Sequence, residues 1–300
     1  MKKFCLMLAA LSALMLSGCA ASGEGQIVAT SFPCYDFARQ VAGDAAQVKM
    51  LIRPGAEVHS YEPSPSDILD IGGADLFVYI GGESDVWVDG ILDSLGSGAP
   101  RSVKLMDAAT LLQEDHGGED GQDHAEMDEH IWTSPKNAEK MLRAVEEALC
   151  EAMPEQAETF RANADAYAGQ IAQLDADLTA LVAGSARREL VFADRFPFLY
   201  LAHDYGLTYS AAFASCTSET EPSAQTMVRL IQTIQEEKIP AVYIIELSNG
   251  AIARTLSEET GVEVLEMHSC QTVTQQEFDA GESYVSLMRR NLEAMRRGLN

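Results

Sequence analysis

The chain has 300 residues, of which 47% are apolar and 22% are charged. This composition is typical of a globular protein and excludes disordered, collagen-like and coiled-coil classes. The 21 Lys and Arg residues against 46 Asp and Glu residues give a net charge of −25. Such a charge repels a phosphate backbone and argues against a nucleic-acid partner. The length suggests about two domains.

The N-terminal segment predicts an exported, anchored protein. Two lysines precede an apolar run over residues 4–16, which is too short to span a bilayer and is typical of a signal peptide. The run ends in Leu-Ser-Gly-Cys, which resembles a bacterial lipobox; an ordinary signal peptide with an incidental cysteine is the alternative. We expect residues 1–18 to be removed, Cys19 to carry lipid, and residues 19–25 to form a tether to the bacterial cell membrane, outside the cytoplasm.

The first half of the chain alternates strand and helix patterns. Strands are predicted at 27–32, 48–52, 75–80 and 103–105, and helices at 35–42, from 64 onward, at 86–95 and at 134–153. The run over 75–80 is apolar at consecutive positions, which indicates a strand covered on both faces, as in a parallel sheet. Residues 113–129 are rich in Asp, Glu and Gly and include His116 and His124. They lack apolar periodicity and predict an exposed, mobile loop.

The second half begins with a long helix and then repeats the alternation. Apolar residues recur at spacings of three and four from Phe160 to Leu181, which predicts a helix over 154–183, about 43 Å long. Strands follow at 189–192, 208–213, 241–246 and 262–267, and helices at 198–205, 223–237, 250–260 and 284–298. We therefore predict an α/β protein. Two lobes, 26–153 and 184–300, each with a mainly parallel sheet flanked by helices, are joined by one rigid helix.

Three histidines occupy conspicuous positions. His59 lies in an irregular segment after a strand, His130 lies between the acidic loop and a helix start, and His268 directly follows the last strand. Loops that follow strands are where α/β sheets bind ligands, so the three imidazoles could converge on one metal ion. The alternative is that each is an independent surface or capping histidine.

Two carboxylates could join these histidines. Glu246 ends an apolar strand and Asp194 follows another. An acid at the end of a buried strand is costly unless it is paired or functional. Glu246 is therefore either a site residue or the partner of an arginine such as Arg195 or Arg254.

Cysteines and enzyme motifs add little. Cys34, Cys150, Cys216 and Cys270 allow three disulfide pairings that spacing does not separate. The sequence has no His-Glu-x-x-His, Gly-x-Ser-x-Gly, phosphate-loop or Gly-x-Gly-x-x-Gly pattern, which weakens the hypothesis of an enzyme.

Two segments carry a family resemblance. They are residues 54–67 (PGAEVHSYEPSPSD) and 130–138 (HIWTSPKNA), with supporting pieces at 81–85 (GGESD), 221–223 (EPS) and 283–284. The chain resembles the metal-binding lipoproteins of bacterial zinc and manganese ABC importers, solute-binding proteins whose two lobes are joined by one rigid helix. The resemblance covers nearly the whole mature chain.

The resemblance implies a ligand set. It carries the first two family ligands onto His59 and His130. Arg195 occupies the third position, where an arginine cannot bind a cation, so Asp194 beside it is a candidate. His268 falls at or near the fourth position, and Glu246 or Asp194 would complete the site.

Three imidazoles and one carboxylate favour Zn²⁺ over Mn²⁺. The acidic loop resembles a shortened form of the loop in zinc members. Within the second lobe we also predict a disulfide between Cys216 and Cys270, which would brace the His268 loop.

The resemblance implies capture of zinc and its delivery to an ABC permease with its ATPase. No enzymatic activity is expected, because a saturated metal leaves no open position, and the protein is expected to be a monomer. The alternatives are a secreted metal-dependent hydrolase with Glu246 as general base, and a surface adhesin or passive metal buffer. The rigid helix predicts only a small lobe movement on binding.

Overall fold

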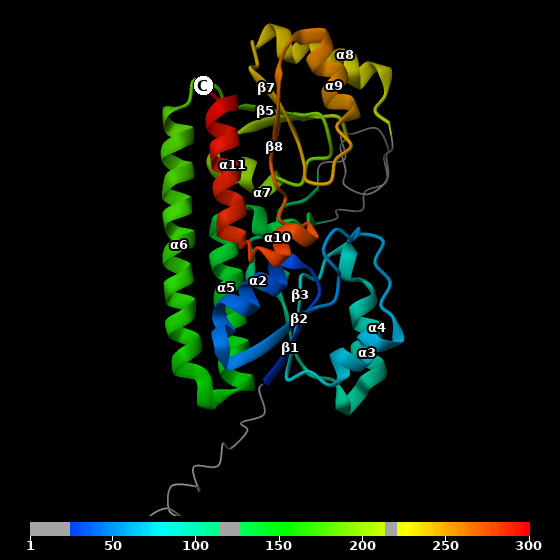
Figure 1. Ribbon diagram of the computed structural model, residues 1–300, viewed down its shortest axis with the longest axis vertical. Helices are drawn as coiled ribbons and strands as arrows, with labels where there is room; N and C mark the ends of the chain where they lie inside the picture. Colours follow the sequence, from blue (N-terminus) through cyan, green and yellow to red (C-terminus); the bar gives the residue numbers. More distant parts are fainter. Residues whose placement is uncertain (1–24, 115–126, 214–220) are drawn as a thin grey trace, which may run out of the picture.

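The computed structural model describes residues 25–114, 127–213 and 221–300. They form two α/β lobes that share one long helix along one side (Figure 1). Each lobe holds a four-stranded sheet whose neighbouring strands all run parallel. The predicted fold class is confirmed. The predicted signal peptide, the lipidated Cys19 and most of the acidic loop lie outside the described residues.

The N-terminal lobe has helices on both faces of its sheet. Its strands are β1 (Gly25–Ala29), β2 (Ala46–Met50), β3 (Leu76–Tyr79) and β4 (Arg101–Lys104), in the spatial order β2-β1-β3-β4. Its helices are α2 (Phe32–Ala42), α3 (Pro65–Gly72), α4 (Trp87–Leu95) and α5 (Pro135–Ala152). Alternate side chains of β3 enter different cores: Val78 packs with residues of α2 and α5, and Phe77 with residues of α3 and α4. All four β3 side chains are buried, as the continuous apolar run predicts.

The C-terminal lobe repeats this strand order. Its strands are β5 (Glu189–Phe192), β6 (Thr208–Ala211), β7 (Ala241–Ile244) and β8 (Glu263–Glu266), in the order β6-β5-β7-β8. Its helices are α7 (Leu199–Tyr205), α8 (Ala224–Glu236), α9 (Ala251–Thr260), α10 (Gln275–Asp279) and α11 (Tyr284–Gly298). The short α10 was missing from the sequence prediction; a capping box between Thr274 and Glu277 starts it.

The helix α6 (Ala157–Gly184) spans both lobes (Figure 1). A 3₁₀ turn at Pro154–Gln156 precedes it, so the helix starts three residues later than the pattern predicted. All seven predicted apolar positions on its core-facing stripe are buried: Phe160, Ala164, Tyr167, Ile171, Leu174, Leu178 and Leu181. They pack against α2 and α5 of one lobe and α11 of the other. One continuous apolar core therefore runs along the connection and stiffens it.

A fully buried carboxylate reinforces this connection. Asp36 of α2 accepts hydrogen bonds from the Tyr167 hydroxyl on α6 (2.7 Å) and from the Tyr284 amide that begins α11 (2.8 Å). Arg39 donates to the second oxygen of Asp36 (2.8 Å). A buried charge is tolerable when it is paired and hydrogen-bonded. This one fixes α11 of the C-terminal lobe to the N-terminal lobe.

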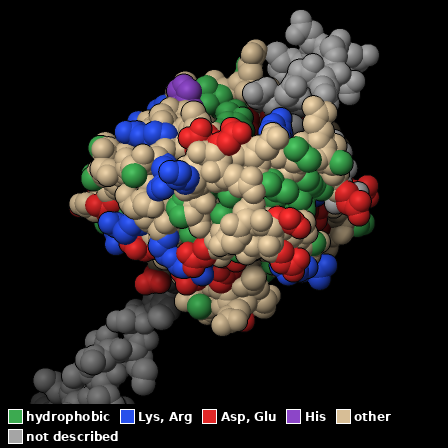
Figure 2. Space-filling view, turned by 90° about the horizontal axis from the view of Figure 1, so that it is seen from above, with side chains coloured by type: hydrophobic (Ala, Val, Ile, Leu, Met, Phe, Trp, Pro, Cys, Tyr) green, Lys and Arg blue, Asp and Glu red, His purple; other side chains and the backbone are tan. Residues whose placement is uncertain are grey.

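The outer end of the C-terminal lobe carries acidic and basic side chains side by side (Figure 2). The net negative charge is therefore not concentrated on this face. Within the described ranges, no helix combines the length and the apolar character needed to cross a membrane.

Candidate metal site between the lobes

His59 lies in the irregular segment between β2 and α3. The segment turns at Gly55, whose φ of 75° is a left-handed conformation that favours glycine. The Gly55 amide donates to the Val273 carbonyl of the other lobe (2.7 Å). The turn thus brings the His59 segment against the C-terminal lobe.

Two partners orient the His59 ring. Its Nδ1 atom lies 3.0 Å from the Ser84 hydroxyl and 3.2 Å from Glu129 Oε1. The other oxygen of Glu129 accepts from the Ser84 amide (2.8 Å). A carboxylate at Nδ1 holds the ring proton there and leaves the lone pair on Nε2, which is the arrangement that metal-ligating histidines adopt.

The carboxyl of Glu129 is charged at neutral pH. Burial opposes its ionisation, but contact with His59, the nearby His130 and two hydrogen bonds from Ser84 lower its pKa to about 2. Both Glu129 oxygens are committed to these partners. Although Glu129 clusters with the two histidines within metal-binding distance, its contacts suit a group that orients His59 better than a metal ligand.

His130 is buried next to His59. Its backbone amide donates to Asp128 Oδ1 (2.7 Å), and its Nδ1 lies 3.2 Å from the same oxygen. This carboxylate places the His130 lone pair on Nε2, as Glu129 does for His59. The two ring centroids are 5.8 Å apart, so one ion could contact both imidazoles.

The end of the predicted acidic loop is not exposed. Asp128 and Glu129 are 5% and 6% exposed, which corrects the expectation of a solvated segment through residue 129. Their charges are accepted in the interior because each faces an imidazole and hydrogen-bond donors. Residues Gln113 and Met127 form an isolated antiparallel bridge at the base of the loop.

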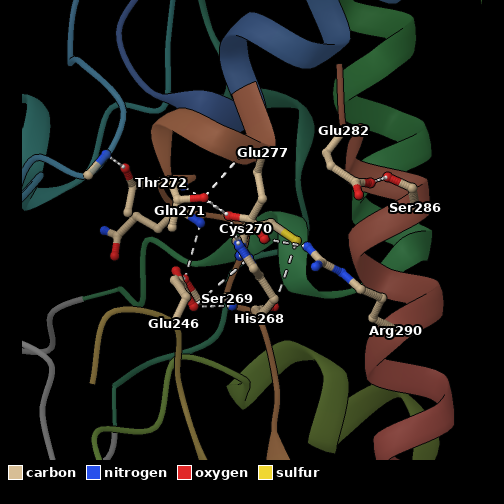
Figure 3. Close-up of polar contacts among 12 residues, drawn as sticks. Glu246, His268, Ser269, Cys270, Gln271, Thr272, Glu277, Glu282, Ser286 and Arg290 are labelled. Atoms are coloured by element: carbon tan, nitrogen blue, oxygen red, sulfur yellow. Dashed lines mark hydrogen bonds and ion pairs between the residues drawn. The ribbon is translucent and has the colours of Figure 1, made fainter. Parts of the chain in front are cut away.

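His268 does not join this pair, which contradicts the ligand set inferred from the sequence. Its Nδ1 accepts a hydrogen bond from the Cys270 amide (2.9 Å). The proton of the neutral ring is therefore on Nε2, which makes no hydrogen bond and lies 3.6 Å from Glu277 Oε2. The ring is 2% exposed and faces α10 and α11 (Figure 3).

The charges around His268 form a separate network. Burial opposes protonation, but Glu246 and Glu277 together raise the pKa of His268 above its usual value. The contact with His268 lowers the pKa of Glu277, and Arg290 (2.6 Å) adds to this effect. The network braces the interior of the C-terminal lobe.

The two predicted carboxylates border the cavity between the lobes, which measures about 770 Å³. Glu246 pairs with neither Arg195 nor Arg254 in the described structure; its oxygens accept from the amide (2.7 Å) and hydroxyl of Ser269. Asp194 accepts from the Arg195 amide (2.9 Å). The Arg195 guanidinium lies 3.7 Å from Glu57.

The residue of the C-terminal lobe that reaches the histidine pair is Gln271, which the sequence interpretation missed. Its side-chain nitrogen lies 3.1 Å from His59 Nε2. Gln271 lines the same cavity as His59, Asp194 and Glu246. The signal in the sequence is its place in the loop after the last predicted strand, where His268, three residues earlier, is the more typical zinc ligand.

The remaining predictions concern cysteines and the acidic loop. Cys270 is fully buried and is a free thiol among the described residues. Cys216 lies outside the described residues, so its disulfide with Cys270 stays a prediction. Within the described structure, hydrogen bonds of Glu246 and His268 brace the Cys270 loop. His116 and His124 also lie outside the described residues.

Two α/β lobes on one long helix, with His59 lining the cavity between them and the buried His130 beside it, define a solute-binding protein of the metal type. The chain belongs to the family described as zinc-uptake complex component A, periplasmic, whose model matches residues 27–298.

Named relatives agree with this placement. The chain is 36% identical over 307 residues to the zinc-binding lipoprotein AdcA of Streptococcus pneumoniae, covering 99% of this chain and 61% of AdcA. It is 30% identical to the high-affinity zinc uptake system protein ZnuA of Bacillus subtilis, covering 91% of this chain and 87% of ZnuA. The Zn(II)-bound ZnuA-like domain of S. pneumoniae AdcA superposes with a TM-score of 0.78 at 35% identity, covering 92% of this chain and 99% of that domain. The chain thus spans about three fifths of the AdcA proteins.

Proposed function

We propose that this protein captures a zinc ion between its lobes, outside the cytoplasm, and delivers it to an ABC permease and its ATPase. The observation that carries the proposal is the pair His59 and His130. Each imidazole has a carboxylate at Nδ1, which turns Nε2 into the metal-binding atom. Imidazole nitrogen favours zinc over manganese, which prefers oxygen ligands. Family membership and the zinc-binding relatives support the same cargo.

The proposed setting follows from the sequence and the relatives' names. Cys19 would carry the lipid that holds the protein at the bacterial membrane, and AdcA of S. pneumoniae is named a lipoprotein. The acidic loop with His116 and His124 would supply auxiliary metal contacts. We propose that the protein acts as a monomer.

The third and fourth donors belong to the C-terminal side of the cavity. Asp194 and Glu246 remain candidates because both line it. Glu246 would have to exchange the hydrogen bonds from Ser269 for the metal. The same bonds weaken the alternative of a hydrolase, because they compete with the role of a general base.

Metal stoichiometry and competition with a chromophoric zinc chelator test the proposal. The wild-type protein should hold one zinc tightly, and His59→Ala and His130→Ala should each lower the affinity at least about 100-fold, since each removes a direct ligand. His203→Ala is the matched control, because His203 is exposed on α7 and its ring contacts the neighbouring Asp204, away from the histidine pair. Absence of tight zinc, or equal affinity in all four proteins, would overturn the proposal.

A further inference from the structure

A hydrogen bond joins the two lobes at the candidate metal site. The side-chain amide nitrogen of Gln271 lies 3.1 Å from His59 Nε2. Because Ser84 and Glu129 hold the ring proton at Nδ1, Nε2 is an acceptor and the Gln271 amide group donates to it. The contact occupies the lone pair through which His59 would bind a metal.

The position of Gln271 is set by contacts with both histidine-bearing segments. The Val273 carbonyl accepts from Gly55 (2.7 Å), in the segment of His59. The Ser269 carbonyl accepts from the indole of Trp132 (2.7 Å), two residues after His130. The loop 269–273 is therefore fixed to the N-terminal lobe on either side of Gln271.

The same loop is fixed from its own lobe. Glu246 accepts hydrogen bonds from the backbone amide and hydroxyl of Ser269, and the Ser269 hydroxyl accepts from the backbone amide of Gln271 (3.1 Å). Figure 3 shows the Gln271 side chain extending away from His268 and Glu277. The backbone is held while the side chain is directed at the cavity.

A primary amide suits a site that is held by a hydrogen bond when it is empty and that must release a bound metal. Its nitrogen donates a hydrogen bond but offers no lone pair to a metal, whereas its oxygen is a neutral metal ligand. Rotation about the terminal torsion exchanges the two atoms without moving the backbone. When a metal takes the His59 lone pair, the hydrogen bond is lost, and the turned amide presents its oxygen to the same ion.

We propose that Gln271 is one contact of the C-terminal lobe with the cargo, a hydrogen-bond donor to His59 in the empty protein and a neutral oxygen ligand in the loaded one. The inference rests on the proposed function. A neutral oxygen leaves the charge of the ion less compensated than a carboxylate would. The site therefore binds zinc less tightly than the same site with an acid at this position, which favours release to a permease.

Cobalt spectroscopy and zinc competition test Gln271 directly. The proteins are wild type, Gln271→Ala, Gln271→Glu and the control Gln275→Ala, whose exposed side chain donates a hydrogen bond to Asp279 within α10. We expect Gln271→Ala to lower the affinity for zinc about 10–100-fold, by analogy with the loss of other groups that support a metal. Gln271→Glu should raise the affinity on the order of 10-fold, because a carboxylate compensates the charge of the ion better than a neutral amide.

The visible bands of bound Co²⁺ separate a ligand from a structural residue. Both Gln271 variants should shift these bands relative to wild type, and Gln275→Ala should not. If wild type binds cobalt and zinc but Gln271→Ala has the same spectrum and affinity, the role of Gln271 is overturned and the proposed function still stands. If wild type binds neither metal, the proposed function falls and the inference with it.

Discussion

Replacing Glu129 with glutamine should destabilise the metal-free protein in a pH-dependent way. The ordinary pKa of a glutamate is 4.5, and the surroundings of Glu129 lower it to about 2. A difference of this size corresponds to about 3 kcal/mol of preferential stabilisation of the charged form. The side chain is only 7% exposed, so solvent screens little of it. Glu129→Gln removes the charge and keeps the size.

The direction of the pH dependence follows because the pKa of Glu129 is lower in the folded protein than in the unfolded chain. The stabilisation is fully present above about pH 5 and is lost progressively as the pH falls toward 2. Urea unfolding of wild type and Glu129→Gln should therefore differ by up to about 3 kcal/mol at pH 7, and the difference should shrink between pH 5 and pH 3. Glu139→Gln, at an exposed position of α5, is the control. A difference that stays constant over this range would refute the assignment of Glu129 as the ionised partner of His59.

Three further predictions concern the connection and the thiols. Leu174→Ala should cost about 2–5 kcal/mol in urea unfolding, because Leu174 is fully buried where α6 meets the core; a cost below 1 kcal/mol would contradict the continuous core. Small-angle scattering should give nearly the same radius of gyration with and without zinc, since α6 and the Asp36 bonds fix the lobes; a large compaction would argue for a hinge. Cys270 should resist thiol reagents in the folded protein, because burial raises its pKa well above the usual value, whereas the partly exposed Cys150 should react before the buried Cys34 and Cys270.

The architecture could be predicted because its signals are local. The apolar run that became β3 and the stripe from Phe160 to Leu181 on α6 are read from spacing alone, and both are buried as expected. Parallel sheets followed from the alternation of strands and helices. The short α10 was not predicted, because five residues are too few to show a helical period.

The residues of the N-terminal half of the site could be predicted from the sequence, and those of the C-terminal half could not. His59 and His130 stand in distinctive segments, and the structure brings them together. Beyond β8, the direction of each side chain depends on loop hydrogen bonds that no pattern encodes. The Cys270 amide and Asn291 turn His268 into the lobe, while Gln271 extends into the cavity.

Glu129 was missed for a related reason. In the sequence it ends a run of acids and glycines, which predicts a solvated segment. Its burial depends on Ser84, 45 residues earlier in the chain, and on the two imidazoles beside it. A composition-based interpretation weighs neighbours in sequence, whereas the charge of Glu129 is compensated by neighbours in space.

The two lobes use the same type of contact to support the site. In each, a glutamate binds both the amide and the hydroxyl of a serine that follows a strand: Glu129 binds Ser84 after β3, and Glu246 binds Ser269 after β8. What each pair positions differs. The first fixes the ring of His59, and the second fixes the loop that carries Gln271. The lobes thus approach the cavity with matched supports but unequal donors, a strong imidazole on one side and a neutral amide on the other. A site built this way suits an ion that must be captured and then given up.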